Sequence, residues 1–402
     1  VISGAGNYIK AGSGTQTLTG NNSYTGSTTI SAGLLKIIRD DPTSYLAATS
    51  GFTGPGNLTI ESSGDDFTAD IVTGTHVQLA GTALGNLIIG KTGNTRQIDL
   101  SSDITTTGTQ TYNGPVRLVG GDRTVSTTNS NVIFASTVNS DGTQRALTVT
   151  NGTGDTTFSG AIGGSAPVKS LTITSDQLTA GAITLNGALT ATLGGSSSIT
   201  GVIANGASTA NLVKAGSGTL TLSGANTYTG TTTINAGDLT VSGSLHDSTA
   251  VTIASGADYN VNASDTVASI EGAGNIVIAS SQTLTAGDGN DKTLSGVISG
   301  AGNYIKAGSG TQTLSASNTY TGTTQVSAGT LTVSGSGRLS DSTAVTVDSG
   351  AVYNVAVSDT VASIAGAGSI TLGSNTLTSG GSDASTTFSG VISGTNGNII
   401  KA

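Results

Sequence analysis

The sequence contains no cysteine, no methionine and no tryptophan, and only 9% of its 402 residues are charged. Without cysteine there is no disulfide framework, thiol catalyst or cysteine-ligated zinc, which favours an exported protein. The low charge content excludes coiled coils and long charged helices. The net charge of −9 has the wrong sign for holding nucleic acid or anionic lipid, so we expect neither partner.

Long apolar segments are also missing. No run approaches the roughly 18 apolar residues of a membrane-spanning helix. The first ten residues, VISGAGNYIK, lack the charged-then-apolar order of a signal peptide. We therefore expect neither a membrane span nor a signal peptide in these residues.

Short strand patterns fill the chain instead. Glycine supplies 61 positions, and poor helix formers such as Thr, Ser, Asn and Val occupy most windows. Alternating runs recur every ten or so residues between Gly, Asn, Asp and Ser clusters, as in TLTL (219–222), AVTI (250–253) and NIVI (275–278). This rhythm predicts an all-β fold with many turns.

The sequence is internally repeated. VISGAGNYIKAGSGTQTL at 1–18 recurs letter for letter at 297–314, and LVKAGSGTLTL at 212–222 is a third copy. The last twelve residues begin another copy, so we expect the chain to be a slice of a longer array. We divide it into a repeat at 1–37, a less regular segment at 38–201, two copies of one unit at 202–296 and 297–390, and the start of a further repeat at 391–402.

Repeats of this kind predict a solenoid, because each coil has an aliphatic face that only a neighbouring coil can bury. With coils of about 20 residues, Leu220, Leu222 and Ile234 would point inward and the alternating threonines outward. Gly and Asn at the corners supply the positive φ angles that turn the chain. We expect an all-β solenoid forming a single elongated rod.

The phrase KAGSGTLTLSGANTYTGTTTINAGDLTVSG (214–243) resembles the passenger-associated transport repeat, or autotransporter-associated β-strand repeat, of Gram-negative autotransporter passengers. The resemblance is strong at 202–243 and 297–335 and good at 1–37, while the centre is similar to filamentous-haemagglutinin-like adhesins. It implies a right-handed parallel β-helix, export through an outer-membrane barrel and display at the cell surface.

The resemblance implies a non-enzymatic adhesin segment without cofactors, acting as a stalk and a possible adhesive surface. Its expected partners are the translocator barrel during export and a host-cell ligand, a matrix ligand or neighbouring cells. One-chain autotransport and export by a partner protein both stay open. Unpaired strand edges also predict end-to-end self-association. The alternatives are a polysaccharide-active β-helix enzyme and a phage or surface-layer fibre.

The enzyme alternative rests on the densest acidic patch, Asp65, Asp66 and Asp70, with His76 nearby. Paired carboxylates on adjacent coils can act as acid and base on a glycosidic bond. A solvated acidic turn has the same sequence appearance, and we expect no catalytic site. The chain has only two histidines, so very few positions could supply the base of a catalytic triad.

Two other motifs are similar to known ligand-binding loops. Residues 85–92 fit G-x-x-x-x-G-K-[ST], but a strand pattern follows where a phosphate-binding loop needs a helix. GDGND at 287–291 is similar to a calcium-binding nonapeptide, with Asp288 and Asp291 as candidate ligands. The matching stretch of the next unit reads SGGSD, so we expect neither a nucleotide nor a metal.

A tyrosine and an asparagine recur within the phrase N-[ST]-Y-T-G. The tyrosines are Tyr24, Tyr228 and Tyr320, and the asparagines are Asn22, Asn226 and Asn318. Exposed tyrosines could stack on sugar rings, but we expect each ring to be buried at a corner with its hydroxyl in water. The asparagines would then satisfy turn amides. Asp265 and Asp359, which each enter a strand, are expected to cap turns.

Overall fold

The computed structural model describes residues 2–42, 51–81 and 84–402, which form two compact units, 1–210 and 211–402. Residues 43–50 and 82–83 of the predicted central segment lie outside this description. All named strand pairs in both units are parallel. The described residues contain no helix, so none could serve as a membrane-spanning one.

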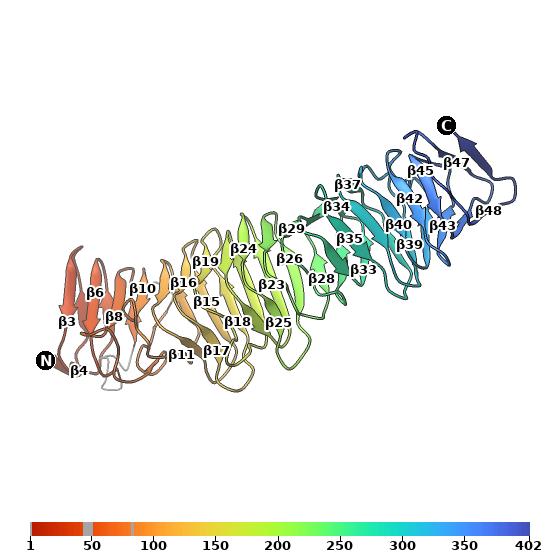
Figure 1. Ribbon diagram of the computed structural model, residues 1–402. Coiled ribbons are helices and arrows are strands. Elements are labelled where there is room, and N and C mark those ends of the chain that lie inside the picture. Colours follow the sequence, from red (N-terminus) through yellow and green to blue (C-terminus); the bar gives the residue numbers. More distant parts are fainter. Residues whose placement is uncertain (1, 43–50, 82–83) are drawn as a thin grey trace. The chain divides into compact units, whose positions relative to one another are not determined.

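Unit 1 is built from six groups of parallel strands (Figure 1). The longest contains β3 (Thr15–Leu18), β6 (Leu34–Ile38), β8 (Asn57–Glu61), β10 (Leu87–Ile89), β13 (Gln110–Tyr112), β16 (Val132–Phe134), β19 (Thr156–Phe158), β21 (Leu178–Ala180) and β24 (Ser197–Ile199). The second contains β12 (Ile104–Thr106), β15 (Arg123–Thr127), β18 (Leu147–Thr150), β20 (Leu171–Ser175) and β23 (Ala188–Leu193). The others are β9 (Ile71–Val72), β11 (Ile98–Leu100), β14 (Val116–Leu118) and β17 (Val138–Ser140); β2 (Tyr8–Lys10), β5 (Thr28–Ile30) and β7 (Phe52–Thr53); β1 (Ser3–Gly4) and β4 (Ser23–Tyr24); and β22 (Ile183–Leu185) and β25 (Ile203–Asn205).

Unit 2 is built from four such groups. The first contains β27 (Thr219–Leu222), β29 (Gly237–Val241), β31 (Ala257–Val261), β34 (Asn275–Ile278) and β37 (Ile298–Gly300). The second contains β26 (Asn211–Ala215), β28 (Thr232–Ile234), β30 (Ala250–Ile253), β33 (Ser269–Gly272), β36 (Lys292–Leu294), β39 (Thr311–Leu314), β41 (Thr330–Val333), β43 (Val352–Val355), β46 (Ser369–Thr371) and β48 (Val391–Ser393). The others are β32 (Asp265–Val267), β35 (Thr283–Ala286), β38 (Asn303–Lys306), β40 (Thr324–Val326), β42 (Ala344–Val347) and β45 (Ser363–Gly366); and β44 (Asp359–Val361), β47 (Thr376–Ser379) and β49 (Asn398–Lys401).

The core of each unit consists of stacked apolar side chains, aliphatic and aromatic. In unit 2, Leu220 pairs with Leu239, Leu239 with Tyr259, and Tyr259 with Ile276, and all four are fully buried. Burying a side chain of this size contributes about 1.5–3 kcal/mol, and strict alternation keeps every second residue inside. Each coil therefore buries its inward face only against its neighbours.

Partnered residues lie about 20 positions apart in the chain, as predicted for one coil. The prediction of an all-β parallel solenoid is confirmed for both units. Leu220, Leu222 and Ile234 are fully buried, as their positions in alternating strands predict. The alternation that buries them fixes the register because a one-residue slip would turn the aliphatic set toward solvent.

Candidate functional site

The acidic patch of unit 1 bonds to the backbone of the next coil. Asp65 is exposed. Asp66 accepts hydrogen bonds from the Thr95 hydroxyl (2.6 Å) and from the Thr95 and Arg96 amides. These bonds lower the pKa of Asp66, mainly through the Thr95 hydroxyl and amide. A general acid needs the opposite shift.

Asp70 also faces the next coil. It accepts a bond from the Gln97 amide, and its carboxylate lies 3.8 Å from the Arg117 guanidinium. Arg117 makes a closer two-pronged contact with Asp99, at 2.8 and 2.6 Å. The nearby His76 ring accepts a hydrogen bond from the Val72 amide, and burial lowers its pKa. Asp66 and Asp70 thus join neighbouring coils through hydrogen bonds, and Asp70 also lies near the Arg117 cation.

The two ligand-like motifs lie in the turns and strands of the coils. Asp288 accepts bonds from the Asn290 amide (2.7 Å) and side chain (2.9 Å), and Asp291 accepts one from the Thr311 amide (2.7 Å). Across the described residues, no three histidine or carboxylate groups gather as a metal site. Residues 85–92 contain strand β10, and the next named element is strand β11, so the described structure has no helix there.

The recurring tyrosines are buried at corners. Tyr228 and Tyr320 are fully buried and Tyr24 is 3% exposed. Each hydroxyl is bonded to a threonine four residues on, at 2.6 Å for Thr28 and for Thr232. The expectation of a hydroxyl in water is therefore wrong, because a threonine takes the place of water. A ring this deeply buried offers no face to a sugar.

The recurring asparagines bridge coils at the same corners. Asn22 accepts a bond from the Ile2 amide (2.7 Å), and Asn318 accepts one from the Ile298 amide (2.8 Å). Their side-chain amides donate to the carbonyls of Gly20 and Ala316, both at 3.0 Å, two residues earlier. Asn226 donates in the same way, to Gly224. Asn22 and Asn318 thus each fix their own turn and the backbone of the preceding coil.

Sequence reasoning missed a buried lysine in each transport-type repeat. Lys10, Lys214 and Lys306 are 6%, 0% and 1% exposed. Each ammonium donates to three backbone carbonyls. The signal was present in the thrice-repeated KAGSG, but an isolated lysine in a Gly-Ser turn normally indicates a solvated side chain.

Two buried aspartates, Asp265 and Asp359, occupy equivalent corners of the duplicated units. Asp265 accepts bonds from the Tyr259 hydroxyl (2.8 Å) and from the Leu245 amide of the preceding coil (3.1 Å). It is 5% exposed, and burial raises its pKa to about 6. Burial also raises the pKa of Asp359. These residues are core groups as well as turn groups.

We expect Asp265 to make unit 2 less stable as the pH rises from about 4 to about 6. A folded-state pKa above the unfolded value means that the folded chain binds the proton more tightly, so this stabilisation is present in acid and lost on ionisation. Asp265→Asn should remove on the order of 2 kcal/mol of this pH dependence. Urea unfolding of both proteins across that range tests it, and parallel curves would contradict it.

One sheet face of unit 1 carries two rows of hydroxyl side chains. The first row is Thr124, Thr148, Thr172 and Thr190, and the second is Ser126, Thr150, Thr174 and Thr192, each residue in register with the next. The residues between the rows are buried, so the hydroxyls point outward. This uncharged surface spans four coils.

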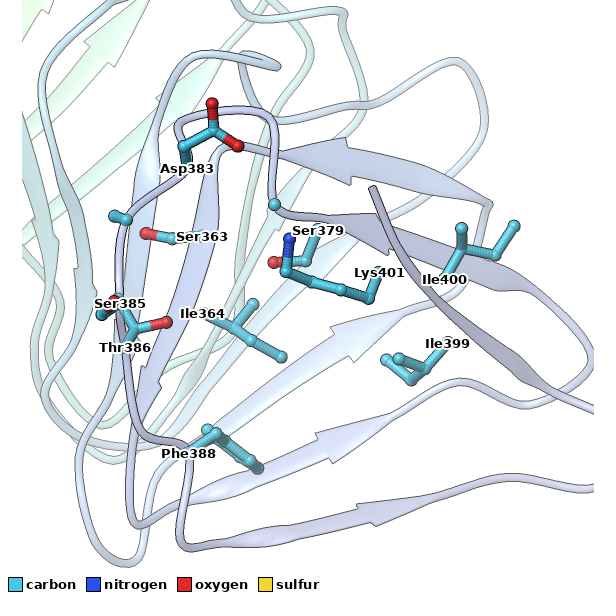
Figure 2. Close-up of a pocket in the computed structure, with 12 residues that line it drawn as sticks. Ser363, Ile364, Ser379, Asp383, Ser385, Thr386, Phe388, Ile399, Ile400 and Lys401 are labelled. Carbon is cyan, nitrogen blue, oxygen red and sulfur yellow. The ribbon is translucent and has the colours of Figure 1, made fainter.

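A pocket of about 530 Å³ lies beside the last strands of unit 2 (Figure 2). Ile364, Phe388 and Ile399 give it apolar walls, and Asp383 and Lys401 add charge. Ile399, together with Val391 and Ile400, belongs to the exposed large hydrophobic side chains of the described chain. The lining also includes the buried Ser363 and Ser379.

Parts of the sequence are similar to known bacterial surface proteins. The passenger-associated-transport-repeat family matches residues 9–37, 212–241 and 305–333. Each match contains one buried lysine and one buried tyrosine corner. Over 131 residues, 30% of the chain, the sequence is 34% identical to the adhesin BmaC autotransporter of Brucella suis biovar 1 (strain 1330). No solved structure matches the chain.

The described chain is thus a parallel solenoid that carries three copies of the passenger-associated transport repeat. These matches support an autotransporter passenger that is exported to the bacterial cell surface. The aligned stretch covers 4% of the length of the Brucella adhesin.

Proposed function

We propose that the segment is a rigid β-helical stalk of a surface adhesin, which spaces a binding region from the cell and offers its own side as a possible adhesive surface. The observation that carries this proposal is the use of almost every distinctive side chain in contacts between coils. The recurring tyrosines, asparagines and lysines, and the unit 1 acids Asp66 and Asp70, bond within or between coils. Such contacts stiffen a stack.

A non-enzymatic role fits the same contacts. A polysaccharide-active enzyme would need an acid with a raised pKa in a cleft, whereas hydrogen bonds lower the pKa of Asp66. The buried Asp265 does have a raised pKa, but its carboxylate is enclosed by the Tyr259 hydroxyl and backbone amides. The transport repeats favour a passenger over a phage or surface-layer fibre.

The proposed partners are an outer-membrane translocator barrel during export and, at the surface, a host-cell ligand, a matrix ligand or a neighbouring cell. Low charge and the absence of cysteine ease threading through a barrel. The exposed apolar side chains of β48 and β49 support self-association of the isolated chain. Translocation by a domain of the same chain and by a separate protein are both compatible with the proposal.

Binding of the purified chain to glycan arrays and to matrix proteins tests the proposal, with a polysaccharide-hydrolysis screen alongside. We expect no turnover. If the side of unit 1 is adhesive, Thr172→Arg on the hydroxyl rows should reduce binding at least tenfold, because a charge interrupts the uncharged face. Thr233→Arg, at the partly exposed middle position of β28 in unit 2, is the matched control. Light scattering separates binding from self-association, and hydrolysis would refute the stalk.

A further inference from the structure

We propose that each transport repeat is built around a buried cation site, that the repeat's own lysine fills this site, and that the lysine latches one coil to the next. The site is formed by backbone carbonyls rather than carboxylates. It occurs three times, once within each segment that matches the transport-repeat family. This inference concerns how the repeat holds its coils and is independent of the adhesive role.

The geometry is the same in the three copies. The Lys214 ammonium donates to Ala215 (3.0 Å) and Gly216 (2.9 Å) in its own turn and to Ala236 (3.0 Å) in the next coil, 22 residues on. The corresponding acceptors are Ala11, Gly12 and Ala32 for Lys10, and Ala307, Gly308 and Ala328 for Lys306. An ammonium has three donors, so every donor is used.

The lysines have no carboxylate partner. No ion pair involves Lys10, Lys214 or Lys306 in the described part of the chain, although Asp238 lies near enough to Lys214 to favour its charge. Burial is the larger effect and lowers the pKa of Lys214 to about 8. An uncompensated buried charge is costly, so the carbonyl dipoles must replace the lost water. The convergence of three carbonyls on each ammonium is therefore a built site.

Glycine brings the carbonyls together. Gly216 and Gly237 have φ angles of 75° and 62°. A Cβ on Gly237 would lie against the carbonyl oxygens of Gly216 and Gly218, so the backbone of the next coil passes directly over the turn. Gly33 and Gly329 lie in the same way over the turns that follow Lys10 and Lys306. The motif K-A-G-S-G followed about 20 residues later by A-G therefore encodes the site.

The third acceptor makes the hydrogen bonding of the lysine depend on the stacking of two coils. Ala236 belongs to the following coil, so the ammonium is fully bonded only when both coils are folded. The latch thus adds to the coupling between adjacent coils on which solenoid stability depends.

Replacing the lysine and supplying a free cation tests the site in the whole chain. In Lys214→Ala, we expect amide hydrogen exchange in β26 and β28 to accelerate at least tenfold, and n-propylammonium chloride to restore protection. Equal concentrations of n-propanol or sodium chloride should not restore it, because neither supplies an alkylammonium. Lys292→Ala, which removes a lysine that pairs with Glu271 at the surface, is the matched control.

The proposal is overturned if Lys214→Ala exchanges like the parent, or if propanol protects as well as propylammonium. Should Lys214→Ala not fold, Lys306→Ala gives the same comparison in a second copy. A measurement on the unmodified chain is independent of both. Nitrogen-15 NMR should show slowly exchanging ammonium protons for Lys10, Lys214 and Lys306 but not for the exposed Lys169, and fast exchange at all four would also overturn it.

Discussion

Gly237→Ala is expected to destabilise the start of unit 2 by at least ~3 kcal/mol. The residue has a φ of 62°, which costs an alanine about 1–2 kcal/mol by itself. The new Cβ would in addition collide with two backbone oxygens, of Gly216 and Gly218, and backbone cannot move aside as a side-chain tip can. The coil following the Lys214 turn would have to shift away from it.

Gly256→Ala separates these two effects. Gly256 has a φ of 80°, but a Cβ there would meet nothing within 4 Å. We expect this control to lose only the backbone strain of about 1–2 kcal/mol. Hydrogen exchange in β27 and β29, with urea unfolding, measures both variants. Equal losses in the two proteins would show that close approach of the coils contributes nothing at Gly237.

Phe134→Ala should destabilise unit 1 by about 3–5 kcal/mol, the cost typical of removing a buried aromatic ring. Phe134 is fully buried between Tyr112 and Phe158, with ring centroids 5.0 and 4.8 Å away. The three rings are in register on neighbouring strands and nearly parallel. Alanine would leave a cavity that the flanking coils, held by their ladders, cannot close.

Phe134→Leu is the control for the ring itself. Leucine keeps most of the apolar volume but loses the stacking, so a loss of about 1–2 kcal/mol is expected. Urea unfolding followed by tyrosine fluorescence, with hydrogen exchange in β13, β16 and β19, gives both values. A loss below about 1 kcal/mol for the alanine variant would contradict the idea that this aromatic column holds unit 1 together.

Local patterns were sufficient for the strands and the repeat. TLTL at 219–222 alternates threonine and leucine, and only its leucines are buried, because a strand points successive side chains to opposite faces. The glycines of KAGSG indicated a corner for a similarly local reason. The expected burial of Tyr228 followed from its place in a recurrent turn phrase, but its bond to Thr232 did not.

Contacts between coils could not be predicted from local sequence patterns. Asp66 looked like a possible acid because its neighbours in sequence are acidic, whereas its partners in space lie 29 and 30 residues away. The hydroxyl rows were missed for the same reason, since Thr148, Thr172 and Thr190 come together only once unequal coil lengths are known. Lys214 resembled a surface residue until Ala236 supplied its third carbonyl.

The sequence by itself determined the β-solenoid, the length of its coil and its transport repeats, because alternation and periodicity are properties of neighbouring positions. Tertiary structure alone decided which polar groups are buried and what they bond, because each coil places residues about 20 positions apart in direct contact. The lysine site illustrates this division. The KAGSG turn occurs three times in the sequence, but its carbonyls and that of the next coil converge on the ammonium only when the coils stack.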